Sequence, residues 1–136
     1  MPEPKLIIGY FGIGKSTLQE LRQDLDIFDL HHVPTLAYLT DNLDHDYIVA
    51  DPDWLKVFGR YVRENNRRFY LILPSLDRKD EFLYNIANRT EGMHNEWFIN
   101  RRDREWEKEI TALATTKNAD VRILRSGYLA DIIDQL

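Results

Sequence analysis

Apolar residues recur along this chain with two different spacings, one typical of strands and one typical of helices, and the two kinds of segment alternate. Short apolar or alternating runs lie at 5–10, 25–30, 69–74 and 120–124, and runs of this length bounded by turn residues are typical of β-strands. Apolar residues at helical spacing occupy the segments between these runs. Strands that alternate with helices predict an α/β fold, with a small and mostly parallel sheet of about four to five strands and helices on both faces.

Five amphipathic segments predict the main helices. They are expected at 16–24, 51–66, 80–87, 96–115 and after 127. In the first, Leu18 and Leu21 are expected to be buried. The long fourth segment carries Arg102 on its apolar seam, one turn before Trp106. A charged side chain is rarely buried without a partner, so Arg102 should contact a carboxylate, from Asp103 or from across the fold, or a phosphate.

The stretch from 33 to 50 is the least regular part of the chain, and its end has two interpretations. Tyr47-Ile-Val-Ala-Asp51 has the pattern of a short strand that ends in an acid, a position from which a carboxylate can hold a metal ion. Asp51 also precedes Pro52, which is typical of a helix N-cap followed by proline in the first helical position. The cap accounts for Asp51 without a metal and is the favoured interpretation.

Composition bounds the classes of function. A length of 136 residues, with 43% apolar and 30% charged residues, is that of one domain, 1–136, able to bury a core. A net charge of -5 gives no strong nucleic-acid signal and disfavours an anionic-membrane binder. The chain has no cysteine, which excludes disulfides and thiolate metal sites and fits a reducing, cytoplasmic location. No apolar run approaches membrane-spanning length.

One motif carries the most specific chemistry. Residues 9–17, Gly-Tyr-Phe-Gly-Ile-Gly-Lys-Ser-Thr, fit the phosphate-loop pattern between an expected strand and an expected helix. Glycines let the backbone turn so that its N–H groups point at a phosphate chain. Lys15 brings positive charge to the β- and γ-phosphates, and the Ser16 hydroxyl is a ligand for Mg²⁺. The motif predicts a nucleoside triphosphate site for ATP and Mg²⁺ made by Gly9, Gly12, Ile13, Gly14, Lys15, Ser16 and Thr17.

Asp29 is a second candidate ligand for Mg²⁺. It ends the strand expected at 25–30, and ligands of open α/β sheets lie at the carboxyl ends of strands. An aspartate that only caps a turn is the equally weighted alternative, and Asp51 is the rival acid. Farther along the chain, four arginines form a basic cluster at positions 89, 101, 102 and 104. Ion pairs on a solvated helix, such as Arg101 with Glu105, are the simpler explanation for these arginines.

Several segments together carry a resemblance to a known group of proteins. They are 7–17, Asp51-Pro-Asp-Trp54 with Tyr61, Leu73-Pro-Ser75 with the helix after it, and Ser126-Gly-Tyr-Leu-Ala-Asp131. They resemble the small phosphate-loop proteins of bacteriophages and prophages that are described as nucleotide- or nucleoside-kinase-like ATPases. More broadly, the layout is similar to adenylate-kinase-like P-loop NTPases. The resemblance implies a three-layer α/β/α fold with an arginine-bearing lid, here an insert at about 77–106.

The resemblance also implies an activity, the transfer of the γ-phosphoryl group of ATP to a nucleoside or nucleotide. Lys15 would hold the phosphates, Arg102 first and Arg89 second would neutralise the transferred group, and the segment 34–53 would line the acceptor site. Two departures, Asp29-Leu-His-His32 in place of an aspartate-serine run and a missing strand and helix before 69–74, keep alternatives open. These are a regulatory nucleotide-binding protein without turnover and a simple ATPase that acts on a protein partner.

Overall fold

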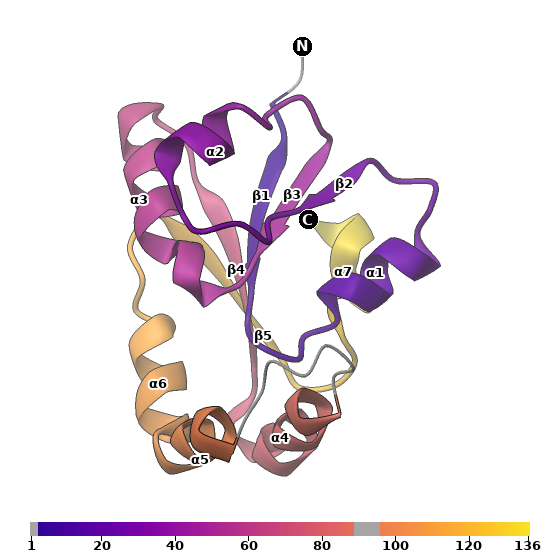
Figure 1. Cartoon of the computed structure of the whole chain (residues 1–136), viewed down its shortest axis with the longest axis vertical. Coiled ribbons are helices and arrows are strands. Elements are labelled where there is room, and N and C mark those ends of the chain that lie inside the picture. Colours follow the sequence, from indigo (N-terminus) through magenta and orange to yellow (C-terminus); the bar gives the residue numbers. More distant parts are fainter. Residues whose placement is uncertain (1–2, 89–95) are drawn as a thin grey trace.

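A computed structural model describes residues 3–88 and 96–136, which form an α/β fold (Figure 1). Within these residues, five strands make one all-parallel sheet in the order β2-β3-β1-β4-β5. The strands are β1 (Lys5–Gly9), β2 (Ile27–Asp29), β3 (Tyr47–Ala50), β4 (Phe69–Pro74) and β5 (Ala119–Leu124). The expected α/β class and parallel sheet are confirmed, and the strand that leads into the glycine loop lies at the centre.

Helices cover both faces of this sheet. The α-helices are α1 (Lys15–Leu21), α2 (Leu36–Thr40), α3 (Leu55–Glu64), α4 (Lys79–Ala87), α5 (Glu96–Arg104), α6 (Trp106–Leu113) and α7 (Leu129–Ile132), with 3-10 turns η1 (Pro52–Trp54), η2 (Leu76–Arg78) and η3 (Ile133–Gln135). Figure 1 shows α2, α3 and α6 on one side of the sheet and α1 and α7 on the other. The helices α4 and α5 lie beyond the carboxyl ends of the strands (Figure 1). The architecture is therefore three-layered, α/β/α.

The inner strands supply most of the apolar core. Almost every side chain of β1, β3 and β4 is buried, because both faces of these strands are covered by helices. The edge strands β2 and β5 are more exposed. Helices add large buried side chains from both sides, among them Leu18 of α1, Phe58 of α3 and Leu129 of α7.

Two expectations about individual elements were wrong, and one open alternative is resolved. The strand pattern at 47–50 is confirmed as β3, which pairs directly with β1 and completes a five-stranded sheet. The helix expected at 96–115 bends at Glu105, whose φ of -106° and ψ of 14° leave helical geometry, so that α5 runs beyond the strand ends while α6 packs on the sheet. The first helix ends at Leu21 because Arg22 adopts a φ of -123°. Leu21 is 65% exposed instead of buried.

The strand order creates a point of divergence at the carboxyl ends of β1 and β3. From β1 the chain passes through α1 to one edge of the sheet, and from β3 it passes through α3 toward the other edge. Ligands of open parallel sheets bind where neighbouring connections diverge in this way. Ile8 pairs with Ala50, so the glycine loop and Asp51 begin at the same level, on adjacent strands.

Candidate functional site

The loop from β1 to α1 is built on glycines at positions that exclude side chains. Gly12 and Gly14 have φ angles of 81° and 94°, in the left-handed region that strains other residues. A Cβ on Gly9 would lie 2.5 Å from Cγ2 of Ile13, which is itself buried beneath the loop. The backbone is therefore held in a tight curl that directs the chain into α1.

Lys15 is the first residue of α1, and its side chain folds back along the loop. Its Nζ donates a hydrogen bond of 3.0 Å to the carbonyl oxygen of Gly9, and the residue is only 8% exposed. A buried ammonium is costly unless negative charge or oriented dipoles surround it. The loop therefore holds a positive charge near its own backbone, as the motif predicts for a phosphate site.

A pocket of about 610 Å³ opens beside this loop. It is lined by Gly12, Gly14, Lys15, Ser16 and Thr17, so the structure brings together five of the seven residues expected to contact nucleotide. Gly9 and Ile13 support the loop without lining the pocket. The volume lies within the range of small-molecule sites, roughly 300–1,000 Å³.

Sequence reasoning missed the far wall of the pocket. It is formed by Asn85 and Asn88 at the end of α4, by Tyr128, Ala130 and Asp131 at α7, and by Glu20 and Leu21 of α1. The exposed Leu21 thus belongs to the pocket. The sequence predicts a helix after 127, but no local pattern indicates that α7 returns beside the glycine loop.

Asp51 takes the capping role that the sequence favours. It directly follows β3, and its Oδ1 accepts a hydrogen bond of 2.8 Å from the backbone N–H of Asp53, which caps η1. Neighbouring strands lie about 4.8 Å apart, and β3 pairs with β1. Asp51 therefore caps η1 about one strand spacing from the glycine loop, and its role as a ligand for Mg²⁺ stays a prediction.

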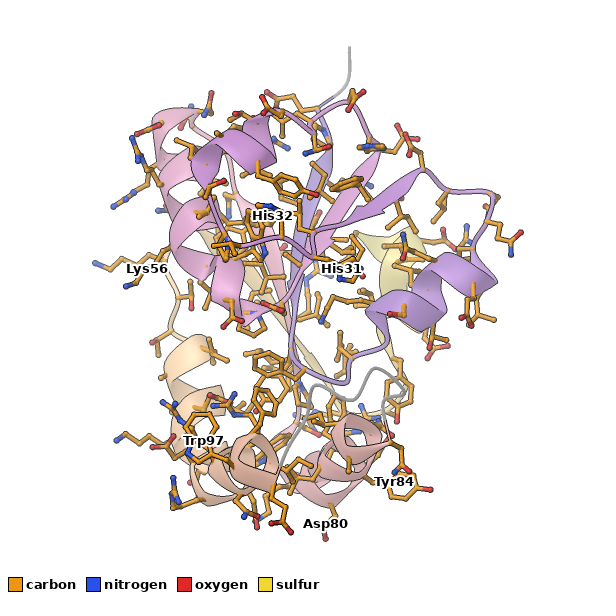
Figure 2. All side chains as sticks on the ribbon, in the orientation of Figure 1. His31, His32, Lys56, Asp80, Tyr84 and Trp97 are labelled. Atoms are coloured by element: carbon orange, nitrogen blue, oxygen red, sulfur yellow. The ribbon has the colours of Figure 1, made fainter. Side chains whose placement is uncertain are left out.

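Asp29 is less well placed than Asp51. It ends β2, so β3 separates it from β1, a distance of roughly two strand spacings, or about 10 Å. Its Oδ2 lies 3.3 Å from Nε2 of His31, an exposed residue that Figure 2 shows between α3 and α1. Among the described residues, no three His, Asp or Glu side chains gather to hold a metal by themselves.

Asp53 adds a second carboxylate at the end of β3. The pKa of Asp53 is raised above its ordinary value, first by loss of water around the carboxyl group and then by the charge of Asp51. The positive charges of Arg102 and Lys15 act in the opposite direction. The residue as a whole is exposed, so the shift is a modest effect. It places Asp53 within electrostatic reach of both the loop lysine and α5.

Arg102 is buried and engaged, as its position on an apolar seam predicted. Its Nη2 lies 3.1 Å from Oε2 of Glu109, and its guanidinium carbon lies 4.7 Å and 5.3 Å from the ring centres of Phe98 and Phe11. Glu109 also accepts a hydrogen bond of 2.5 Å from the hydroxyl of Tyr10. Burial and this carboxylate raise the pKa of Tyr10. Two residues of the glycine loop are thus tied to α5 and α6.

Other expectations about the basic cluster had mixed outcomes. A carboxylate partner for Arg102 is confirmed, but it is Glu109. Asp103, one of the alternatives, pairs with Lys79 at 2.8 Å. The ion pair of Arg101 with Glu105 is confirmed at 3.1 Å. Arg89, the second candidate catalytic arginine, lies outside the described residues.

Comparison of this chain with known protein families and curated proteins does not assign it to a family. No protein-family model matches the chain, and no curated protein matches it. In residues 3–88 and 96–136, every helix is too short or too polar to span a lipid bilayer. The candidate function therefore depends on the site itself.

Proposed function

We propose that this protein binds a nucleoside triphosphate at the glycine loop and that it is a phosphotransferase. The observation that carries the proposal is the buried Lys15, held against the Gly9 carbonyl at 3.0 Å, next to a pocket of about 610 Å³. A strand, a loop that requires glycine, and a helix that begins at lysine supply the context that the phosphate-loop motif needs. Loop N–H groups and Lys15 would hold the phosphates, with the base toward Asn85 and Tyr128.

The residues at the strand ends fit a Mg²⁺ ion bound with the phosphates. Ser16 lines the pocket, and Asp51 begins beside the loop on the neighbouring strand. A hydroxyl and a carboxylate are oxygen donors of the kind that Mg²⁺ takes in addition to phosphate and water. When bound, the ion would neutralise charge on the phosphates. We prefer Asp51 to Asp29 as the carboxylate ligand for Mg²⁺, because β3 lies next to β1 whereas β2 does not.

Phosphoryl transfer needs positioning and charge compensation more than covalent chemistry by the protein. Arg102 is the candidate for compensation, because it stacks on Phe11 of the loop and shares the electrostatic surroundings of Asp53 with Lys15. In this role it would exchange Glu109 for the transferred group. The acceptor would be a nucleoside or nucleotide that enters from the side of η1. ATP is the donor that we expect.

One observation supports a second function, nucleotide binding without turnover. Arg102 is already paired with Glu109 at 3.1 Å, and a regulatory protein would have no need to release it. A coupled assay with Mg-ATP and a panel of nucleosides and nucleoside monophosphates separates the two functions. Turnover that depends on one acceptor supports the phosphotransferase. Triphosphate binding with no turnover on any acceptor supports the regulatory protein, and phosphate release without an acceptor indicates a simple ATPase.

A further inference from the structure

A chain of four polar side chains runs from η2 to the wall of the nucleotide pocket. Arg78 donates to both oxygens of Glu81, at 2.9 Å and 2.7 Å. The hydroxyl of Tyr128 donates to Oε2 of the same carboxylate. Nδ2 of Asn85 donates to that hydroxyl oxygen at 2.9 Å. The network connects a buried arginine to a residue that lines the pocket.

The numbers of donors and acceptors on these four side chains determine which group donates in each hydrogen bond. The bidentate contact of Arg78 and the hydrogen bond from Tyr128 lower the pKa of Glu81, so its carboxylate is ionised and can only accept. Tyr128 must then give its single proton to Glu81, and its oxygen can only accept from Asn85. One N–H of Asn85 is therefore held on Tyr128, which fixes the orientation of the amide and leaves the carbonyl oxygen Oδ1 as the acceptor that Asn85 offers to a ligand.

The position of this oxygen matters because Asn85 stands beside the glycine loop. A Cβ on Gly12 would lie 3.5 Å from Cβ of Asn85. Within the described residues, Oδ1 of Asn85 accepts no hydrogen bond. Asn88, one turn later, repeats the arrangement, since its Nδ2 donates to the backbone carbonyl oxygen of Tyr84 at 2.7 Å. Both asparagines thus have an amide whose orientation is fixed by a hydrogen bond from Nδ2, and each offers its carbonyl oxygen as an acceptor.

We propose that Asn85 determines base specificity, selecting a base with an exocyclic amine over one with a carbonyl oxygen at the same position. An amine donates to Oδ1, whereas a carbonyl oxygen would place two acceptors together and leave both unpaired in a partly desolvated site. Tyr128, Glu81 and Arg78 are positioning residues that stop the amide from turning over. The inference rests on the proposed triphosphate site, whose phosphate contacts are made by different residues.

The direct test compares ATP with ITP, which differ by an amine or a carbonyl at position 6 of the purine. Calorimetry on the wild-type protein with Mg²⁺ should find ATP bound more tightly, by roughly tenfold to a hundredfold. CTP and UTP form a second pair with the same difference. Equal affinity for ATP and ITP overturns the inference and leaves triphosphate binding intact. Binding of neither nucleotide overturns both the inference and the proposed function.

Two variants test the hydrogen-bond network that holds the amide of Asn85. Tyr128→Phe keeps the ring but releases the amide of Asn85, so the preference for ATP over ITP should fall to about threefold or less while ATP still binds. Tyr84→Phe is the matched control, because it removes a hydroxyl from a 69% exposed tyrosine on the outer side of α4 (Figure 2). Asn85→Ala removes the carbonyl oxygen that would accept from the base, so this variant should also lose the preference for ATP over ITP. Full discrimination in both Tyr128→Phe and Asn85→Ala contradicts the proposal.

Discussion

Arg102 and Glu109 form an ion pair across the bend between α5 and α6, with 3.1 Å between Nη2 and Oε2. The arginine is 7% exposed, and its Nε has no hydrogen-bond partner within the described part of the chain. The pair belongs to a network that includes Tyr10 of the glycine loop. This arrangement stabilises the protein without ligand, although one buried guanidinium N–H of Arg102 is unpaired among the described residues.

Arg102→Ala should therefore act on both stability and turnover. Loss of the buried guanidinium leaves Glu109 with Tyr10 alone and removes the contact with two aromatic rings, which should lower the free energy of unfolding by about 1–3 kcal/mol. Denaturant unfolding measures this effect. If the arginine also compensates transferred charge, turnover should fall by more than ATP affinity does.

Arg104→Ala is the matched control for this prediction. Arg104 lies on the same helix but is exposed, and its replacement should change the free energy of unfolding by less than about 0.5 kcal/mol. Wild-type turnover in a folded Arg102→Ala protein would reduce Arg102 to an anchor for α5.

Asp51→Asn tests the acid at the end of β3. Asparagine caps a helix as well as aspartate does, so the hydrogen bond to the N–H of Asp53 and the fold should be kept. The loss of charge should weaken Mg²⁺-dependent ATP binding or turnover by about tenfold or more, because the carboxylate would orient the ion. Titration of Mg²⁺ at fixed ATP measures the change.

Asp29→Asn is the comparison for Asp51→Asn. Asp29 lies one strand farther from the loop, so this variant should change the Mg²⁺ dependence less. A larger loss in Asp29→Asn than in Asp51→Asn would restore Asp29 as the preferred metal ligand.

The raised pKa of Asp53 predicts that the stability of the protein depends on pH. Its folded-state pKa is raised, so the ionised carboxylate is disfavoured in the folded protein and costs stability once the pH exceeds the unfolded value of about 3.9. Asp53→Asn should therefore raise the melting temperature at pH 7. The gain should shrink as the pH falls through the acidic range, because the wild-type carboxyl group then becomes protonated. A gain equal at pH 3 and pH 7 would exclude this electrostatic origin.

Two glycine substitutions should have opposite effects on stability. Gly9→Ala places a Cβ 2.5 Å from Ile13, so it should destabilise the protein and distort the loop. A Cβ on Gly59 of α3 meets nothing within 4 Å, and Gly59→Ala should stabilise the helix by about 0.5–1 kcal/mol. Thermal unfolding of the two proteins measures both effects. Destabilisation of similar size in both would show that the loop has no special requirement for glycine at position 9.

The sequence predicted the parts of the fold that local patterns encode. The apolar run at 69–74 forms β4, and the glycines at 9–14 connect β1 to α1, as expected. β3 was harder to assign, because four residues pair as a strand only when β1 and β2 lie on either side. A carboxylate partner for Arg102 was predicted, but the choice of Glu109 depends on the bend at Glu105, which no local pattern indicates.

The candidate site was predicted on the side of the loop and missed on the far side. Lys15 and Ser16 belong to one contiguous motif, so their neighbourhood follows from the sequence. Asn85 and Tyr128 are 43 residues apart in the chain and meet through one hydrogen bond. No periodicity or spacing carries such a long-range contact, and only the assembled fold reveals it.

Binding of Mg-ATP to the wild-type protein and to Lys15→Ala tests the central claim most directly. Lys15 holds no apolar core together, so the variant should fold, and circular dichroism provides that check. Calorimetry should find ATP bound by the wild-type protein, with affinity for the variant lower by about tenfold or more, because a charge-assisted contact to phosphate is lost. Adenosine should bind both proteins with similar weakness. Unchanged ATP affinity in folded Lys15→Ala, or no binding of any triphosphate to the wild-type protein, would contradict the phosphate-loop assignment.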